Sequence, residues 1–371
     1  MNQSEDSGIL VINPGSTTTK LAVFSLAPEP GTLKLEAETS LLVPASIDDQ
    51  ATSLNSQLEQ RQVAIGDWLK THDLTRGLAV IMARGGPLRP LPGGIYTVNA
   101  DMLNDFRSSR YSSHASNLGA LLADALAREY GLTAYIADPV TVDEFEPLAR
   151  ISGVPEIQRK ARSHALNIKA TARRAARNLH LDIESSNFIV AHMGGGISVA
   201  AVQGGRIIDV NDALLGMGPF SPERAGALPL AGLLELAFNG EYSRRQLEEK
   251  LSCNSGLQAY LGSNDLKEIT ARIEAGDEYA KLIVDAMIYQ IAKEIGAMGT
   301  VLNGNIDGLL LTGGMAGSAY LCSELGQRIK HLGESHTYPG EGELLALAEA
   351  GQQVIQNNAV AQIYTAEVTD L

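Results

Sequence analysis

Cysteine is scarce in this chain. Only Cys253 and Cys322 are present, with no CxxC pair and no Cys/His cluster, so the sequence supports neither a disulfide framework nor a structural zinc site. Positive charge is also in deficit, because 29 Lys and Arg face 43 Asp and Glu for a formal net charge of −14. This balance argues against a general nucleic-acid or anionic-membrane binder, and we expect neither partner.

Long apolar runs are missing as well. The most apolar longer stretch, 225–238, contains Pro229 and Glu235 and is shorter than a membrane span requires, so we predict no transmembrane segment. The first six residues are acidic where a signal peptide would be basic, and the apolar run after them is short. With so few cysteines, we expect an unprocessed cytoplasmic protein. A length of 371 residues at 44% hydrophobic composition predicts roughly two domains with buried cores rather than disorder.

Glycine is abundant at 37 residues, and it gathers at the ends of apolar runs. A strand at 8–12, a turn of small residues at 13–20 and a strand at 21–24 open the chain. The same pattern returns about 180 residues later, with predicted strands at 188–192, 197–202 and 206–210 and the turn Gly194-Gly195-Gly196 after the first of them. The sequence therefore predicts two similar halves.

A third glycine cluster, 312–317, follows a predicted strand at 308–311, and Ser318 is placed to cap the helix after it. Helical patterns fill the gaps: 117–130 with Ser116 as N-cap and Gly131 as its end, 155–181 with Pro155 in its first turn, and a long buried helix at 277–302. We interpret the basic residues of the second helix as a solvated face; they are Arg159, Arg162, Lys169, Arg173 and Arg177. Strands followed by helices throughout predict an α/β fold.

A change of domain is expected near 136–142, where an apolar strand ends in Asp138-Pro139 and an acidic segment follows. We expect an N-terminal domain at 1–140 and a C-terminal domain at 141–342. The Ala/Leu-rich helical segment within 343–371 is expected to pack back onto the first domain.

Small-residue turns between apolar strands can bind phosphate, because backbone N–H groups approach an anion closely and hydroxyls add donors. An ordinary hairpin also needs turn residues, but three such clusters in one chain favour phosphate binding. No GxxxxGK[ST] occurs, and 193–199 and 312–317 do not fit GxGxxG, which argues against a P-loop NTPase and a Rossmann dehydrogenase.

Six segments resemble, in content and order, the butyrate-kinase branch of the acetokinase family: NPGSTTTK (13–20), ARGG (83–86), HASNLG (114–119), AHMGGGIS (191–198), GPFSPER (218–224) and LTGG (311–314). This family is related to sugar kinases, Hsp70 and actin. The resemblance implies two ribonuclease-H-like, actin-like ATPase domains flanking an ATP cleft, with 1–140 on the acyl-substrate side and 141–342 as the nucleotide-binding domain. It also implies reversible ATP- and Mg²⁺-dependent phosphorylation of butanoate, a short-chain fatty acid, to butanoyl phosphate, and a homodimer or higher homo-oligomer.

A carboxylate acceptor is already ionised at pH 7, so it needs help to approach a like-charged triphosphate rather than a strong base. Arg84, at the end of a predicted strand, and Arg224, in a Gly/Pro-flanked loop, are the candidates to clamp the carboxylate and the phosphoryl group. The alternative is that either is a solvated loop arginine. Acetate kinases carry a substrate-binding arginine three residues before the position of Arg84, where this chain has Ile81; Arg84 would then act from a shifted position, and Ile81 would reshape the acyl pocket.

Two acidic residues match the family's catalytic positions. Asp138 matches an aspartate that holds Mg²⁺ through water or orients the phosphoryl group, although an Asp before Pro139 is also an ordinary turn initiator. Glu343 matches a magnesium-linked glutamate. Glu341 lies two residues away and aligns equally well, so the sequence leaves that choice open.

Three of the seven histidines fall on the matched motifs: His114, His164 and His192. An imidazole can donate to charge that develops on phosphoryl oxygens, and His192 leads directly into a glycine turn. The predicted contacts to ATP are Asn13, Gly15, Ser16, Thr17, Gly194, Gly195, Gly196, Gly313 and Gly314. At Gly195, acetate kinases have the Asn of a Gly-Asn-Gly turn, so only backbone contacts are expected there.

Other functions compete with this interpretation. The same chemistry on isobutanoate, propanoate or acetate is the nearest alternative, because one methylene is worth only about 1 to 3 kcal/mol of discrimination. A nucleotide-driven switch or filament of the actin or Hsp70 kind is a second, and a protein that only binds nucleotide is a third. Acid-dependent turnover distinguishes the first from the other two.

Overall fold

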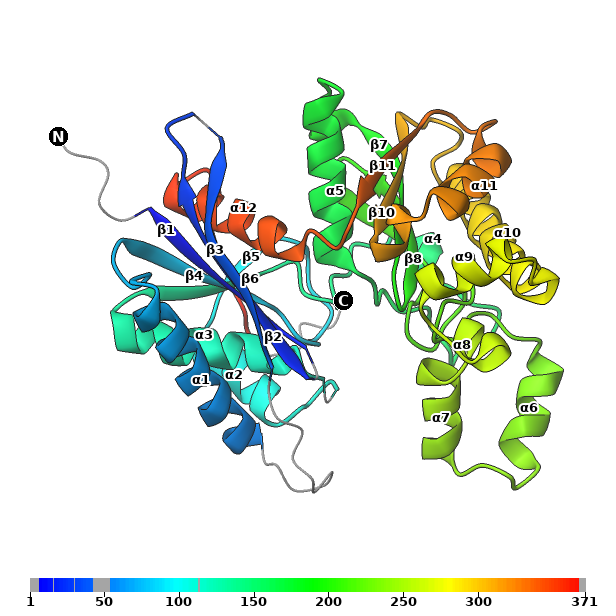
Figure 1. Ribbon diagram of the computed structural model, residues 1–371, viewed down its shortest axis with the longest axis horizontal. Coiled ribbons are helices and arrows are strands. Elements are labelled where there is room, and N and C mark those ends of the chain that lie inside the picture. The colour runs from blue at the N-terminus through cyan, green and yellow to red at the C-terminus, as the bar shows by residue number, and fades with distance from the viewer. Residues whose placement is uncertain (1–6, 16, 30, 43–53, 113, 367–371) are drawn as a thin grey trace. The chain divides into compact units, whose positions relative to one another are not determined.

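The computed structural model describes residues 7–15, 17–29, 31–42, 54–112 and 114–366. The chain divides into two compact units. Unit 1 comprises Met1–Val142 and Gly342–Leu371, and unit 2 comprises Asp143–Glu341. Each unit contains one β-sheet with helices packed on it (Figure 1).

The sheet of unit 1 has the strand order β12-β5-β6-β4-β1-β2-β3. Its hairpin β1–β2 and the pair β2–β3 are antiparallel, whereas β1, β4 and β6 run parallel to one another. The strands are β1 (Gly8–Pro14), β2 (Thr18–Leu26), β3 (Leu33–Leu42), β4 (Leu78–Arg84), β5 (Ile95–Thr97), β6 (Thr133–Ala137) and β12 (Gln362–Ile363).

Helices cover both faces of this sheet, which explains why β1 and β4 are apolar at nearly every position. In Figure 1, α12 lies on one face and α1, α2 and α3 on the other. On the first face, Gly351 of α12 packs against Ile9 and Met82. On the second face, Leu10 and Ile81 join the core beneath α1 and α3. The helices are α1 (Leu54–Thr71), α2 (Ala100–Arg107), α3 (Asn117–Tyr130) and α12 (Glu343–Ile355).

The sheet of unit 2 has the order β11-β10-β7-β8-β9, with β7, β8 and β9 antiparallel and β7, β10 and β11 parallel. This repeats the order β6-β4-β1-β2-β3 of unit 1. The predicted similarity of the two halves and the predicted α/β class are thereby confirmed. The strands are β7 (Asn187–Met193), β8 (Ile197–Gln203), β9 (Arg206–Val210), β10 (Gly308–Gly313) and β11 (Ser335–Pro339).

The long helix α10 supplies much of the core of unit 2, as its four-residue spacing of apolar side chains predicts. Asp277 caps it by accepting a hydrogen bond from the amide of Ala280. None of the helices among the described residues combines the length and apolar character of a bilayer-spanning helix. The helices of unit 2 are α4 (Pro147–Arg150), α5 (Ala165–Asn178), α6 (Leu230–Phe238), α7 (Arg244–Cys253), α8 (Gly256–Leu261), α9 (Leu266–Glu274), α10 (Glu278–Val301), α11 (Ala319–Ile329) and the 3-10 turns Ile183–Ser185 and Gly314–Gly317.

The predicted helix 155–181 is wrong in its first part, because α5 begins only at Ala165. Arg159 donates to Asp209 at 2.7 Å and Arg162 donates to Asp212, so the preceding segment is held in an irregular path by ion pairs to β9 and the residues after it. The predicted solvated basic face is therefore wrong for these two arginines, and also for Lys169, which is buried and pairs with Glu144. Arg177 of the same face is exposed, as predicted.

Two predicted N-caps have different outcomes. Ser318 accepts a hydrogen bond from the amide of Leu321 and caps α11, as predicted. Ser116 precedes α3 but makes no cap bond, because its own backbone is already helical, with φ −65° and ψ −14°. Its hydroxyl lies 2.6 Å from Nδ1 of His114 instead.

Candidate active site

The carboxyl ends of the parallel strands of unit 1 lie at one edge of its sheet. β1 ends at Asn13 and Pro14, and β4 ends at Arg84. Arg84 pairs in register with Ala137 of β6, so Asp138 follows at the same edge. The topology thus brings three of the predicted site residues, Asn13, Arg84 and Asp138, to neighbouring strand ends.

Glu343 joins two of these residues. Its Oε2 accepts hydrogen bonds from Nδ2 of Asn13 at 2.6 Å and from Nη1 of Arg84 at 3.1 Å. Glu343 is the first residue of α12, follows Gly342 in a left-handed conformation (φ 58°), and is only 7% exposed. The side chain of Glu341 is exposed, so Glu343 is the glutamate that unit 1 brings into the predicted site.

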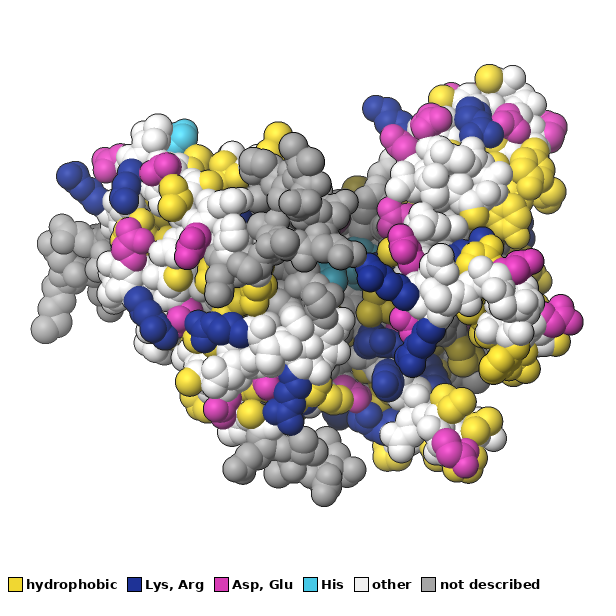
Figure 2. Space-filling view, turned by 90° about the horizontal axis from the view of Figure 1, so that it is seen from below, with side chains coloured by type: hydrophobic (Ala, Val, Ile, Leu, Met, Phe, Trp, Pro, Cys, Tyr) yellow, Lys and Arg dark blue, Asp and Glu magenta, His cyan; other side chains and the backbone are white. Residues whose placement is uncertain are grey.

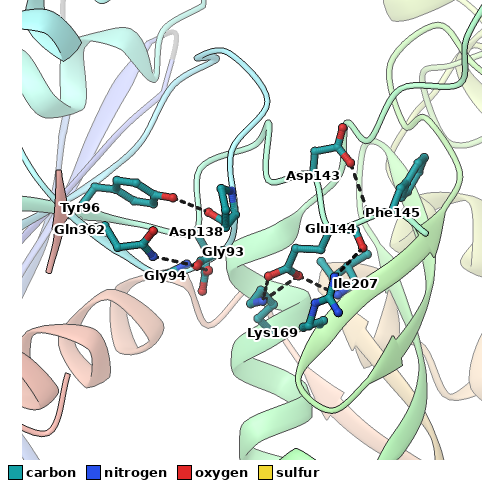
Figure 3. A network of polar contacts seen from close by, with 12 residues as sticks. Gly93, Gly94, Tyr96, Asp138, Asp143, Glu144, Phe145, Lys169, Ile207 and Gln362 are labelled. Carbon is teal, nitrogen blue, oxygen red and sulfur yellow. Dashed lines mark hydrogen bonds and ion pairs between the residues drawn. The ribbon is translucent and has the colours of Figure 1, made fainter. Parts of the chain in front are cut away.

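Asp138 is held in an unusual conformation. Its φ is 40°, which is uncommon for a residue other than glycine, and its side chain is buried. Its Oδ1 accepts from the amide of Gly94 at 2.8 Å, and its own amide donates to the carbonyl of Gly94 at 2.9 Å (Figure 3). These two bonds fix the carboxylate at the strand end.

Glycines allow the N-terminus of α3 to pack directly against the end of β4. A Cβ atom on Gly119 would overlap the carbonyl oxygen of Arg84, and one on Gly86 would lie 2.9 Å from the amide nitrogen of Asn117. His114 lies in the exposed loop before this helix, where its Nδ1 accepts from the amide of Ser116 at 3.1 Å. The ARGG motif (83–86) and the HASNLG motif (114–119) therefore pack against each other at the end of β4, where Arg84 lies.

The turn between β1 and β2 completes the site in unit 1. The amide of Gly15 donates to the carbonyl of Thr18 at 2.7 Å, which closes the turn, and Thr17 is exposed at its tip. Ser16, also a predicted phosphate contact, lies outside the described residues. Arg61 of α1 donates three hydrogen bonds to this turn and to Thr19 beside it, an interaction that the sequence analysis missed.

Unit 2 has an equivalent edge, at the carboxyl ends of β7, β10 and β11. His192 and Thr312 pair in register there, and the predicted glycines follow them. The amide of Gly194 donates to the carbonyl of Gly196 at 3.1 Å, which forms a tight turn. Gly313 has φ 92°, and a Cβ on it would overlap the backbone of Met193, so only glycine fits at this crossing.

Two histidine rings stack beside the glycine turn. The rings of His164 and His192 lie 3.9 Å apart with an interplanar angle of 14°. Nδ1 of His192 lies 2.8 Å from Oδ1 of Asn167, while Nδ2 of Asn167 donates to the carbonyl of Glu341. Because that carbonyl only accepts, the amide oxygen of Asn167 faces His192, and Nδ1 of His192 is the donor. Nε2 then points toward Gly194, whose Cβ would lie 3.4 Å from it.

His164 precedes α5 rather than lying within a helix, and its Nδ1 lies 2.9 Å from Oγ of Ser198 on β8. Asn167 was missed in the sequence analysis. Its position three residues after His164, at the start of a helix that was placed ten residues too early, gave no local signal.

Arg224 lies in a loop folded against the same turn. Its Nη1 donates to the carbonyl of Ala213, and its guanidinium packs where a Cβ on Gly196 would lie. Oγ of Ser221 donates to the carbonyl of Gly195 at 2.5 Å. Within the described part of the chain, the buried Nε of Arg224 makes no hydrogen bond. Burial lowers the pKa of this guanidinium, and Glu223 opposes that shift.

A pocket of unit 2 lies next to Arg224. Asn211, Asp212, Met217 and Pro219 are among the residues that line it. Basic side chains also gather on one area of the face of unit 2 seen in Figure 2, although the whole chain is acidic. Local positive charge of this kind favours an anionic ligand.

The two edges supply different chemistry. Unit 1 has two buried carboxylates, an arginine and an amide, whereas unit 2 has a glycine turn, stacked imidazoles and an arginine. No group of three or more His, Cys, Asp or Glu side chains suited to a metal occurs among the described residues. A divalent cation would therefore rely on one or two carboxylates together with ligand oxygens.

Comparisons with known proteins show which proteins this chain is similar to. A model described as the acetokinase family matches residues 157–367. The chain is similar to the probable butyrate kinase of Enterococcus faecalis, with 45% identity over 361 residues that cover 96% of this chain and 97% of that protein. It is also similar to probable butyrate kinase 2 of Caldanaerobacter subterraneus subsp. tengcongensis, with 44% identity over 362 residues that cover 96% and 99%.

Among solved structures, the chain resembles a propionate kinase from Francisella tularensis subsp. tularensis. The TM-score is 0.73 at 20% identity, and the match covers 93% of this chain and 98% of that one. At this identity the likeness concerns the fold, and it supports the two-sheet architecture described above.

Proposed function

The chain belongs to the acetokinase family, and from that premise we propose that it transfers the γ-phosphoryl group of ATP reversibly to the carboxylate of a short-chain fatty acid, with butanoate as the preferred acid. The observation that carries the proposal is the cluster of Asn13, Arg84 and Glu343 at the carboxyl edge of unit 1. The preference for butanoate follows from the names of relatives that match over nearly the full chain.

The two arginines would make this reaction possible by neutralising charge. A carboxylate and a triphosphate repel each other, and in-line transfer needs them aligned at close range. Arg84, oriented by Glu343, would bind the acid, and Arg224, packed over the glycine turn, would stabilise the phosphoryl group in transit. His192, with Nε2 directed at that turn, would donate to a phosphoryl oxygen when protonated there.

Nucleotide phosphates would bind at the glycine turns. Gly194, Gly195 and Gly196 have no side chains of their own to keep a phosphate from the backbone, and Arg224 packs against Gly196. Gly313 and Gly314 would let adenosine lie close to the backbone. The Gly15–Thr17 turn and the amide of Asn13 would contact the terminal phosphate. In this assignment unit 2 is the nucleotide-binding domain and unit 1 the acyl-substrate domain.

The carboxylates fit a magnesium ion. Mg²⁺ is commonly bound by one or two protein carboxylates with waters and phosphate oxygens completing its shell. Asp138 and Glu343 are buried carboxylates of unit 1, at the strand-end edge and the first turn of α12 respectively. When bound, Mg²⁺ neutralises phosphate charge. The contribution of these two residues is to present oxygens in fixed orientations, Asp138 through Gly94 and Glu343 through Asn13 and Arg84.

Ile81 is completely buried in the core of unit 1, so we do not place it on the surface that contacts the acid. An arginine at this position would place a charge in an apolar core, which is costly. Arg84, at the strand end, is therefore the arginine that we assign to the acid.

Hydroxamate formation tests the proposal. Protein, ATP and Mg²⁺ are incubated with hydroxylamine and with acetate, propanoate, butanoate, isobutanoate or pentanoate. We expect turnover to peak at butanoate and Arg224→Met to lower it by about 100-fold. Arg245→Met, at an exposed arginine of the same unit, is the matched control and should leave turnover unchanged. ATP binding without turnover on any acid would contradict the proposal and favour a nucleotide-driven switch.

A further inference from the structure

Helix α1 carries an arginine on its apolar stripe. Leu58, Ile65 and Leu69 pack against the core of unit 1, and Arg61 occupies the same stripe one turn before Ile65. The residue is only 1% exposed and is the largest fully buried side chain among the described residues. Charged side chains are rarely buried this completely unless they bind specific partners.

The guanidinium reaches the turn between β1 and β2. Nη1 donates to Oγ1 of Thr19 at 2.6 Å and to the carbonyl of Thr18 at 3.1 Å. Nη2 donates to the carbonyl of Gly15 at 3.0 Å. The guanidinium thus binds the carbonyls of Gly15 and Thr18, on either side of the exposed Thr17. It also binds Thr19, the first buried residue of β2.

These contacts affect how the turn meets an anion. A carbonyl oxygen repels phosphate, whereas backbone amides and hydroxyls attract it. Because both carbonyls are bound by Arg61, they are held away from any ligand at the tip. Burial lowers the pKa of Arg61, but an arginine stays charged at neutral pH, so a positive charge lies directly behind the turn.

We propose that Arg61 is a positioning residue for the triphosphate: its guanidinium holds the carbonyls of Gly15 and Thr18 from inside the fold, so that Thr17 at the exposed tip, and not these carbonyls, contacts the terminal phosphate. The proposal rests on the proposed function, which places ATP phosphate at this turn. Arg61 itself touches no ligand in this arrangement.

Ligand binding to Arg61→Met tests the inference. Dissociation constants for ATP and adenosine are measured by calorimetry. Loss of charge-assisted hydrogen bonds to the turn should weaken ATP binding by about tenfold or more and adenosine binding by less than about twofold. Lys70→Met removes an exposed cation of the same helix and should change neither constant. Arg61→Lys keeps the charge without the fork and should give an intermediate value for ATP.

Steady-state kinetics give a second readout. The KM for ATP should rise in Arg61→Met while the KM for the acid stays near the wild-type value. Equal weakening of ATP and adenosine binding, or unchanged ATP binding in a folded variant, would overturn the inference. If Arg61→Met does not fold, Thr19→Val decides the matter, because it removes one acceptor of the same fork and should weaken ATP binding selectively to a smaller extent. Wild-type protein without acid-dependent turnover would instead contradict the proposed function.

Discussion

The carboxyl edges of the two sheets have the same topology but different chemistry. In unit 1, the edge of β1, β4 and β6 gathers charge: Glu343 accepts from Arg84 and Asn13. In unit 2, the edge of β7 and β10 carries a glycine turn and stacked rings, with His192 bonded to Asn167. The repeated strand order determines where a site forms, namely at the carboxyl edge of each sheet. The residues that follow each strand determine what that site can bind.

Unit 2 also has buried charges, but they lie elsewhere. Glu144 and Lys169 form a buried pair at 2.8 Å, and Glu144 also accepts from the amide of Ile207 on β9 (Figure 3). Arg159, which precedes α5, forms another ion pair with Asp209 of β9. Apart from Arg224, these charges of unit 2 hold an irregular segment against its sheet, whereas the charges at the edge of unit 1 are expected to serve catalysis.

The largest effect is expected at Arg84. Arg84→Met removes the cation that faces the acid and leaves Glu343 without its partner, so we expect kcat/KM to fall by about 1,000-fold with little change in ATP affinity. His192→Gln, at the equivalent edge of unit 2, should cost about tenfold, because one hydrogen bond to the phosphoryl group is lost while Arg224 remains. Hydroxamate assays of both variants measure the difference. Equal losses of kcat/KM in the two variants would mean that the edge of unit 1 does not contribute more to catalysis than the edge of unit 2.

Lys169→Met tests the structural role of charge in unit 2. Removing one partner of a buried ion pair leaves the other charge unpaired, which destabilises a fold by about 3 to 5 kcal/mol. We expect a lower urea midpoint for unit 2 and an unchanged kcat per folded molecule. The double variant Glu144→Gln with Lys169→Met keeps an acceptor for Ile207 and should recover part of the stability. A folded Lys169→Met protein with reduced kcat would assign this pair to catalysis instead.

Local sequence signals predicted some features of the fold and the site well. The cap at Ser318 and the strand–turn–strand patterns depend on neighbours in sequence, and they were confirmed. The segment before Ala165 was mispredicted because its path depends on Asp209 and Asp212, about 50 residues away. Helical spacing cannot reveal partners at that separation.

The site shows the same limit. Strand ends placed Asn13, Arg84 and Asp138 at one edge, since parallel strands share their carboxyl ends. The choice between Glu341 and Glu343 stayed open in the sequence, because it depends on how α12 packs against β1 and β4, whose residues Asn13 and Arg84 lie 330 and 259 residues before Glu343. Asn167 and Arg61 act through side chains on helices, where the apolar pattern marks only the core.

Asn167→Asp tests the role of the His192 imidazole at the edge of unit 2. A carboxylate beside Nδ1 of His192 favours the protonated ring, so its pKa should rise. If the protonated Nε2 of His192 donates a hydrogen bond to the phosphoryl group, the alkaline limb of the pH profile of kcat should move up by about one pH unit. Rates measured from pH 5 to 9 on the variant and wild type check this. A profile that keeps its shape would remove His192 from the titrating groups of the reaction.

The smallest effect is expected at Glu294, on the face of α10 toward β9. Burial raises the pKa of this carboxyl and Asp209 adds to the shift, while Arg159 opposes it. A raised pKa means that the folded state disfavours the ionised form, so ionisation costs stability above the folded pKa, and the cost disappears below the ordinary value of 4.5. Glu294→Gln should therefore raise the melting temperature by about 1 to 3 °C at pH 7.5 and not at pH 4. A gain that persists at pH 4 would point to packing rather than charge, and would separate Glu294 from the ion pairs that distinguish unit 2 from unit 1.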